Sequence, residues 1–92
     1  FKFVVVKADK GYFFGPSLKE ALKDTSQQYV DAIWAFESDK DPESFSQDDW
    51  DFVILHSKVG QSGPIRCIRA SIVRFVPRDW DMFLKNADPF GN

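Results

Sequence analysis

The sequence of 92 residues predicts a single α+β domain, in which an antiparallel four-stranded sheet carries one long helix on one face. Three observations predict this fold. Runs rich in Val, Ile and Phe occur near both ends of the chain, as strands require. Between them lies a stretch with apolar residues at helical spacing. The composition, 43% apolar and 16% aromatic, is enough to fill one small core.

The first two strands are predicted to form a hairpin. Val and Phe dominate residues 2–8, which favours a strand, and residues 12–14 are three consecutive aromatic residues that indicate a second one. The intervening Asp9-Lys10-Gly11 ends in a glycine that can adopt a positive φ, as tight hairpin turns need.

A helix is predicted next. Ser17 and Glu20 have the spacing of a capping box, in which each side chain bonds to the backbone of the other residue. Apolar or small residues then recur at helical spacing, at Leu18, Ala21, Leu22, Thr25, Tyr29, Ala32, Ile33 and Phe36. This spacing predicts a long helix over 18–36. Residues 24–26 are poor helix formers, so a kink or a break into two helices near residue 25 is the alternative.

An acidic loop is predicted at 37–51, with a short helical turn near 42–48. Residues 51–57 are predicted to form the third strand. They are apolar at both odd and even positions, which is typical of a strand covered on both faces.

The fourth strand is predicted at 65–76. Neither of its faces is uniformly apolar, so a bulge near 69–71 is expected to shift the alternation. A short amphipathic helix at 78–85 is predicted to cover a sheet edge or the second face. The predicted element order is therefore β-β-α-β-β-α.

Charge is strongly segregated along the chain although the net charge is only −2. Residues 37–51 carry seven acidic side chains and one Lys, a net charge of −6. Residues 52–78 carry five basic side chains and no acidic one. Local patches, rather than the net charge, therefore indicate the partners.

Cysteine and histidine usage restricts the chemistry. Cys67 is the only Cys, so an intramolecular disulfide is excluded and a reducing, cytoplasmic compartment is expected. With His56 as the only His, a zinc site built on nitrogen and sulfur lacks ligands. Cys67 is predicted to be a buried thiol and His56 a surface residue at a strand end, and neither lies in a known nucleophile motif.

Other sites are also unsupported. Asp39, Asp41 and Glu43 alternate as in a calcium loop, but Ser44 and Trp50 stand where that loop needs Gly and Glu. No phosphate-binding glycine motif is present, and the N-terminal apolar run is far shorter than the roughly 20 residues that cross a bilayer. We therefore expect a non-enzymatic protein without a cofactor, a metal site or a membrane partner.

The acidic segment is the first candidate site. Its negative charge would steer association with a basic protein, and its aromatic side chains would anchor the contact, as in an acidic inhibitor or an immunity-type factor. The candidate partner-binding residues are Glu37, Asp39, Asp41, Glu43, Phe45, Asp48, Asp49, Trp50 and Asp51. The alternative is a solubilising loop with Trp50 packed into the core.

The basic segment is the second candidate site. Arginines and aromatic residues on an open sheet are typical of single-stranded nucleic-acid binding, for which the candidate residues are Lys58, Arg66, Arg69, Arg74 and Arg78. Arg69 differs in parity from Arg66 and Arg74, so a bulge is needed to align them. The alternative is that these arginines pair internally with the acidic segment.

A homodimer is the third hypothesis for a partner. An exposed aromatic patch would drive self-association, and its candidate members are Phe1, Phe3, Trp80, Phe83 and Phe90.

Overall fold

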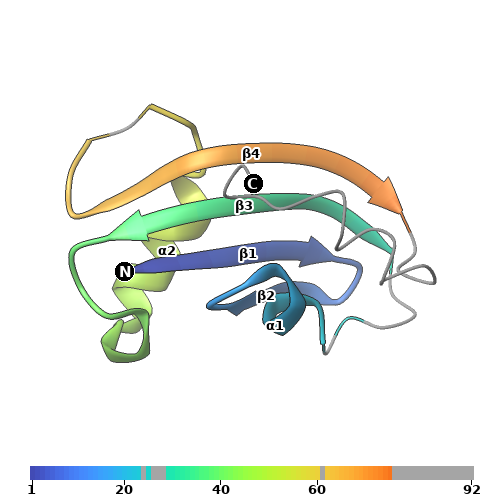
Figure 1. Cartoon of the computed structure of the whole chain (residues 1–92), viewed down its shortest axis with the longest axis horizontal. Helices are drawn as coiled ribbons and strands as arrows, with labels where there is room; N and C mark the ends of the chain where they lie inside the picture. Colours follow the sequence, from blue (N-terminus) through green and yellow to red (C-terminus); the bar gives the residue numbers. More distant parts are fainter. Residues whose placement is uncertain (24, 26–28, 61, 76–92) are drawn as a thin grey trace.

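The computed structural model describes residues 1–23, 25, 29–60 and 62–75. A four-stranded antiparallel sheet with the order β2-β1-β3-β4 forms its centre (Figure 1). The strands are β1 (Lys2–Ala8), β2 (Gly11–Gly15), β3 (Val30–Ser38) and β4 (Ile65–Phe75). Helix α1 (Leu18–Leu22) lies in front of the sheet in that view and helix α2 (Gln47–Leu55) behind it, and a short 3₁₀ helix, η1 (Pro42–Ser44), precedes α2. The prediction of a small α+β fold with such a sheet is confirmed.

The N-terminal hairpin forms as the sequence predicts. β1 and β2 pair antiparallel, and Ala8 and Gly11 form the last pair before the turn. Gly11 has a φ of +133°, a value that side chains rarely tolerate. At the other end of β2, a Cβ on Gly15 would lie 2.8 Å from the backbone nitrogen of Ala21, so glycine lets α1 approach the strand closely.

The long helix predicted over 18–36 is wrong. Ser17 does begin a helix, because its Oγ accepts a hydrogen bond from the Glu20 amide at 3.2 Å. That helix, α1, has only five residues, and residues 30–38 are a central strand. The alternative of two helices is correct in ending the first helix before residue 25 but wrong in its second helix, because that region contains β3.

The reason for this error lies in β3. Both of its faces are covered, so buried residues occur on both, and their spacing imitates that of a helix stripe. Val30, Ile33, Trp34 and Phe36 are β-branched or aromatic, and they suit a sheet that provides neighbours on two sides.

The third strand predicted at 51–57 is also wrong, because most of these residues belong to α2. The apolar run extends over odd and even positions since it winds around a helix. Val53 faces the sheet and is buried, whereas Phe52 and Leu55 are exposed. The signal for the helix stands just before it, where Ser46 and Asp49 form a capping box.

β4 begins at Ile65 as predicted, and it contains bulges. One leaves Ile68 without a partner, just before the predicted 69–71 region, because Phe36 pairs with Cys67 and Ala35 with Arg69. A second register shift follows near the end of the strand, where Arg74 has a φ of +48°. These bulges turn Ile65 and Cys67 toward α2 and Val73 toward α1.

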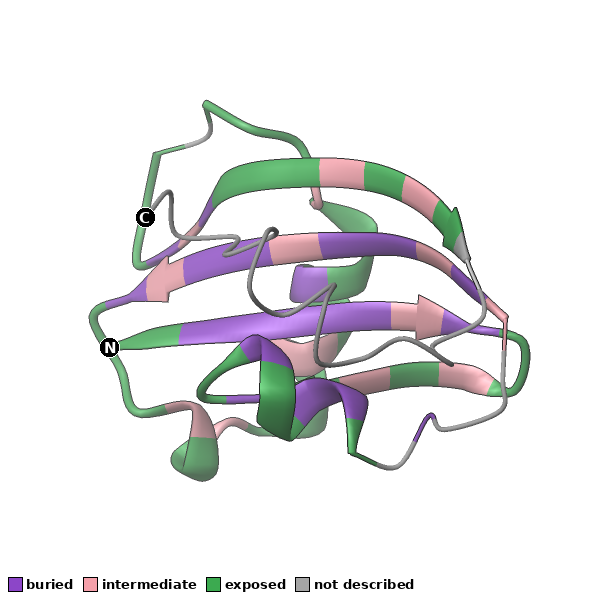
Figure 2. Cartoon of the chain, turned by 45° about the vertical axis from the view of Figure 1, so that its right-hand side comes forward, coloured by how far each residue is buried: buried purple, intermediate pink, exposed green. Residues whose placement is uncertain are grey.

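Two core clusters lie on opposite faces of the sheet. The α1-side cluster consists of Val4, Val6, Leu18, Ala21, Leu22, Val30 and Ile33. The α2-side cluster consists of Phe3, Val5, Phe36, Val53, Ile65 and Cys67. Figure 2 shows the central strands β1 and β3 buried along most of their length, in contrast to β4. Two helices on opposite faces thus replace the predicted single helix on one face.

The aromatic patch proposed for a homodimer changes accordingly. Phe3 is buried and its ring stacks on that of Phe36, with centroids 5.1 Å apart, so Phe3 does not belong to an exposed patch. Phe1 is exposed. The predicted helix at 78–85 and the residues Arg78, Trp80, Phe83 and Phe90 lie outside the described residues.

Within the described part of the chain, α2 is the longest helix, with nine residues, and no helix there has the length and apolar character needed to cross a membrane.

Candidate functional site

The acidic segment 37–51 is more structured than the predicted loop. Glu37 belongs to the end of β3, Asp41 precedes η1, and Asp48 to Asp51 lie in the first half of α2. The predicted helical turn near 42–48 corresponds to η1 and the start of α2. The carboxylates are therefore held on defined backbone rather than on a flexible loop.

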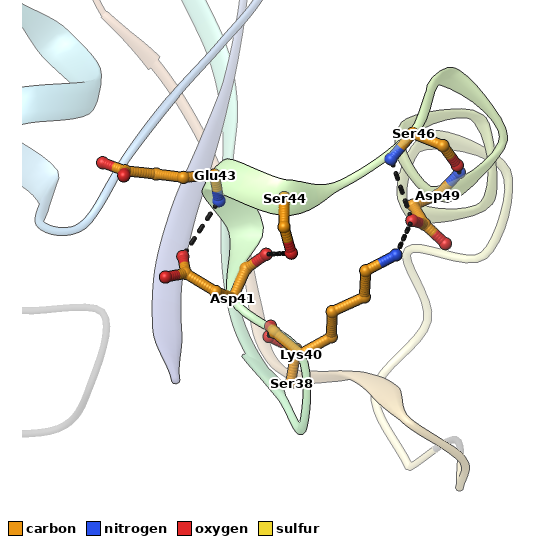
Figure 3. A network of polar contacts seen from close by, with 7 residues as sticks. All are labelled: Ser38, Lys40, Asp41, Glu43, Ser44, Ser46 and Asp49. Carbon is orange, nitrogen blue, oxygen red and sulfur yellow. Dashed lines mark hydrogen bonds and ion pairs between the residues drawn. The ribbon is translucent and has the colours of Figure 1, made fainter.

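The carboxylates of Asp41 and Asp49 accept hydrogen bonds from backbone amides of the same segment (Figure 3). Asp41 accepts the Glu43 amide at 3.0 Å through Oδ1, and its carbonyl accepts the Ser44 hydroxyl at 2.7 Å. The Ser38 hydroxyl donates to the Lys40 carbonyl at 2.6 Å. These contacts fix the turn between β3 and α2. Asp41 is the N-cap residue of η1.

Asp49 is the most strongly engaged carboxylate. Its Oδ2 accepts the Ser46 amide at 2.9 Å and the Lys40 ammonium at 3.0 Å, and its own amide donates to Ser46 Oγ at 3.2 Å. The bond from the Ser46 backbone, followed by that from Lys40, lowers the pKa of Asp49. Asp49 thus stabilises the start of α2.

Arg66 connects the basic segment to the acidic one. Its Nη2 lies 3.6 Å from Oε1 of Glu37, and its Nη1 lies 3.3 Å from Oδ1 of Asp39. Nη1 also donates a hydrogen bond to the Gly63 carbonyl at 2.6 Å. Internal pairing, one of the two interpretations of the basic segment, therefore applies to Arg66. These pairs are partly exposed, so each contributes only about 0 to 1 kcal/mol to the stability.

The other basic candidates are distributed as follows. The bulge places Arg66 and Arg69 on one face, because they pair with residues 37 and 35 of β3. Lys58, Arg69 and Arg74 are exposed. The alignment that nucleic-acid binding needs is thus present for Arg66 and Arg69, and Arg66 is paired with carboxylates.

The aromatic residues predicted as anchors pack against the core. Phe45 and Trp50 are half-buried beside the α2-side cluster, with ring centroids 5.6 and 5.7 Å from that of Phe3. Trp50 also contacts Phe14 of β2, at 4.1 Å between centroids. The two rings attach η1 and α2 to the sheet. This packing agrees with the alternative in which Trp50 packs against the core.

Different apolar residues are exposed on α2. Asp48, Asp51, Phe52 and Leu55 are three or four positions apart and share the face opposite the buried Val53. Leu55 is 77% exposed and Phe52 38%. The neighbouring exposed apolar residues are Ile54 and Val59. We name the set of Asp48, Asp51, Phe52 and Leu55 the α2 surface.

Phe52 and Leu55 are not among the predicted site residues, because residues 51–57 are predicted to form a strand covered on both faces. Their spacing behind a capped helix start is the signal that would have found them. His56 lies at the C-cap of α2, is exposed as predicted, and has its ring 4.4 Å from that of Phe52.

Cys67 is buried in the α2-side cluster, and burial raises the pKa of its thiol. Its Sγ lies 3.4 Å from the Arg69 carbonyl. Among the residues that the structure describes, no group of three or more His, Cys, Asp or Glu side chains is arranged to hold a metal ion. The α2 surface therefore remains the best-defined candidate.

Comparisons with known proteins do not assign a family. No family model, no curated protein and no solved structure matches this chain. The function has to be argued from the surface itself.

Proposed function

We propose that the protein is a non-catalytic module that binds a basic protein through the α2 surface. The observation that carries the proposal is Leu55, a large apolar side chain that is 77% exposed on a helix whose other outward residues include Asp48 and Asp51. Apolar side chains on an acidic face are typical of a contact site rather than of a merely solvated helix.

The apolar and the acidic residues of the α2 surface would contribute differently to binding. Burying Phe52 and Leu55 against a partner would contribute about 1.5 to 3 kcal/mol for each side chain. Asp48 and Asp51 would add little affinity but would accelerate association with a positive surface and would select against acidic proteins. The complementary partner has an apolar groove bordered by Lys and Arg.

The carboxylates differ in how free they are to meet such a partner. Asp49, Glu37 and Asp39 are within ion-pair distance of Lys40 or Arg66. Within the described residues, no such pair involves Asp48 or Asp51, and the hydrogen bond to the Asp51 carboxylate comes from the side-chain Nε2 of Gln47, at 3.0 Å. An acidic inhibitor or immunity-type factor would work by this arrangement.

A matched pair of variants tests the proposal. Leu55→Ser and Ile72→Ser each remove an apolar side chain that is 77% exposed, but Ile72 lies on β4. The tagged chain and both variants would be used to capture proteins from the native lysate with and without nuclease. We expect a basic protein that survives nuclease treatment, is retained by Ile72→Ser and is lost with Leu55→Ser.

Two results would contradict the proposal. One is equal retention of the protein by Leu55→Ser. The other is recovery of nucleic acid alone, lost in the double variant Arg66→Glu and Arg69→Glu, which would support single-stranded nucleic-acid binding by the basic segment instead.

A further inference from the structure

A hollow lies between α2 and β2, next to the α2 surface. Its volume is about 110 Å³, and its lining consists of apolar and aromatic residues. Val5 and Val53 in this lining are buried, whereas Tyr12, Phe14 and Ile54 are 42%, 54% and 37% exposed. The buried residues therefore form the base of the hollow and the exposed ones its rim. We name it the α2–β2 hollow.

Ring contacts hold the rim of the α2–β2 hollow in place. Trp50 of α2 packs on Phe14 of β2, with ring centroids 4.1 Å apart. Tyr12 contacts Trp34 of β3, with ring centroids 6.2 Å apart. Because these rings already restrain one another, little conformational entropy is lost when a partner covers them. The hollow is thus preformed.

The lining and the volume restrict what the α2–β2 hollow accepts. An ordered water needs roughly two to four polar partners, which apolar side chains do not supply. A cavity of about 150 Å³ accepts a benzene ring. At about 110 Å³ the α2–β2 hollow is smaller, so it favours an aliphatic side chain such as that of Leu over an aromatic ring.

Asp51 connects the α2–β2 hollow to the α2 surface. It precedes Ile54 of the rim by three positions and Leu55 of the α2 surface by four. Residues three and four positions apart are neighbours on a helix, so Asp51 lies beside both side chains. A partner that covers Leu55 and reaches the hollow therefore passes Asp51.

The charge around this connection is negative. Three pairs of opposite charge near the hollow cancel: Lys40 with Asp49 at 3.0 Å, Lys7 with Asp31 at 3.9 Å, and Asp9 with Lys10 in the hairpin turn. Among the described residues, neither carboxylate of the α2 surface has a cation within ion-pair distance. Lys58, beyond the C-cap of α2, offsets only one of them. A Lys or Arg complements the charge that remains.

We propose that the basic partner inserts one aliphatic side chain into the α2–β2 hollow and directs a Lys or Arg to Asp51. The α2 surface and the hollow then form one interface, and the inserted side chain is its anchor. This inference rests on the proposed function, because it names a contact that the same partner makes.

The test uses the peptide acetyl-Arg-Leu-Lys-amide, titrated into the isotope-labelled full chain. Three control peptides replace Leu by Ala, Leu by Phe, or both basic residues by Glu. We expect shift changes at the Trp50 indole N–H and the Ile54 methyl groups, with half-saturation in the millimolar range. The affinity should be at least about fivefold weaker for each control, because each loses the aliphatic contact or the charge.

A matched pair of variants locates the contact. Ile54→Ala and Ile68→Ala shorten isoleucines that are 37% and 39% exposed, but Ile68 lies on β4. Ile54→Ala should bind acetyl-Arg-Leu-Lys-amide at least about fivefold more weakly, whereas Ile68→Ala should bind it normally. Both should keep a native circular dichroism spectrum, since Ala is a good helix former and Ile68 is in a bulge. Asp51→Asn should weaken the Leu and Phe peptides equally, by about twofold.

Leu55→Ser separates this inference from the proposed function, because Leu55 does not line the hollow. It should bind the peptide normally although it loses the captured protein. Normal capture by Leu55→Ser would refute the proposed function. Loss of capture by Leu55→Ser together with normal capture by Ile54→Ala would overturn the insertion alone.

Three further results would overturn the inference. They are equal affinity for the Leu, Ala and Phe peptides, shift changes confined to residues outside the hollow, and no shift changes with the peptide at tens of millimolar.

Discussion

The two edges of the sheet differ in how they are protected. β4 has eleven residues, and its edge carries Arg66, Arg69, Arg74 and two register shifts. A parallel bridge from Val59 to Cys67 covers its beginning. β2 has five residues, no charge and exposed aromatic side chains. Charge, bulges and a very short edge strand are all common devices against unwanted pairing, so β4 is protected by its arginines and bulges and β2 by its short length.

The two edges are also supported differently. Trp50 of α2 packs on Phe14 of β2 and reaches Phe3 of β1. At the far end of β4, Ile72 is 77% exposed, and neither core cluster includes it. Among the described residues, β2 is thus backed by a helix that packs on one of its aromatic side chains, whereas the far end of β4 has no such support.

The largest effect should follow from Phe3→Ala, because Phe3 lies between the two edges. Its ring contacts Phe36 on one side and Phe45 and Trp50 on the other. Removing a buried Phe should lower the free energy of unfolding by about 3 to 5 kcal/mol, as urea denaturation would measure. Val59→Ala, which shortens a side chain that is 58% exposed, is the control, and it should change stability by less than about 0.5 kcal/mol.

A smaller effect is expected from Ser46→Ala, which weakens the start of the helix behind β2. Loss of the N-cap of α2 should cost about 0.5 to 2 kcal/mol. Because α2 supports β2, hydrogen exchange should accelerate in β2 more than at Ile72 in β4. Ser62→Ala, which removes an exposed hydroxyl from the loop before β4, is the control. Equal acceleration in the two strands would show that α2 does not support β2 selectively.

The dependence of the protein's stability on pH should reflect Asp49, which stabilises the start of α2. Its pKa in the folded chain is lowered, so its contribution to stability is complete above the pKa of the unfolded chain and is lost as the pH falls through the lower folded value. We expect the wild type to lose more stability than Asp49→Asn between about pH 5 and pH 2, measured by thermal unfolding. Asp48→Asn, on the exposed face, is the control. Parallel curves for wild type and Asp49→Asn would contradict this assignment.

The smallest change in stability should come from the double variant Arg69→Gln and Arg74→Gln, within about 0.5 kcal/mol for each exposed site, because neither change places a β-branched residue at the positive φ of Arg74. Self-association should nevertheless increase, because two charges that guard the β4 edge are gone. Sedimentation at increasing concentration would measure it. A monomer at all concentrations would indicate that the bulges alone protect β4.

Local signals predicted the regions of the fold that local interactions determine. The hairpin around Gly11, the helix start at Ser17 and the beginning of β4 at Ile65 each depend on neighbouring residues, and all three were predicted. The strand at 30–38 was missed because α1 and α2 cover its two opposite faces, which gives buried residues at both odd and even positions. Periodicity at one segment cannot report which faces other segments will cover.

The candidate site, like the fold, was predictable from the sequence only in part. The charge count identified the acidic segment, and the structure places its carboxylates on β3, η1 and α2. The anchors could not be chosen from composition, because Trp50 and Leu55 are both apolar residues near acidic ones. Only the orientation of α2, set by Val53 against the sheet, buries much of Trp50 and leaves Leu55 exposed.

The position of β1 inside the strand order has a kinetic consequence. Apart from Val73, the α1-side cluster draws on residues between Val4 and Ile33, so the first part of the chain can assemble it over short loops. The α2-side cluster joins Phe3 to Cys67 and therefore requires closure of a much longer loop. We expect folding to nucleate on the α1 side and to finish with the docking of β4, so that β2 is already ordered while the far edge is still being completed.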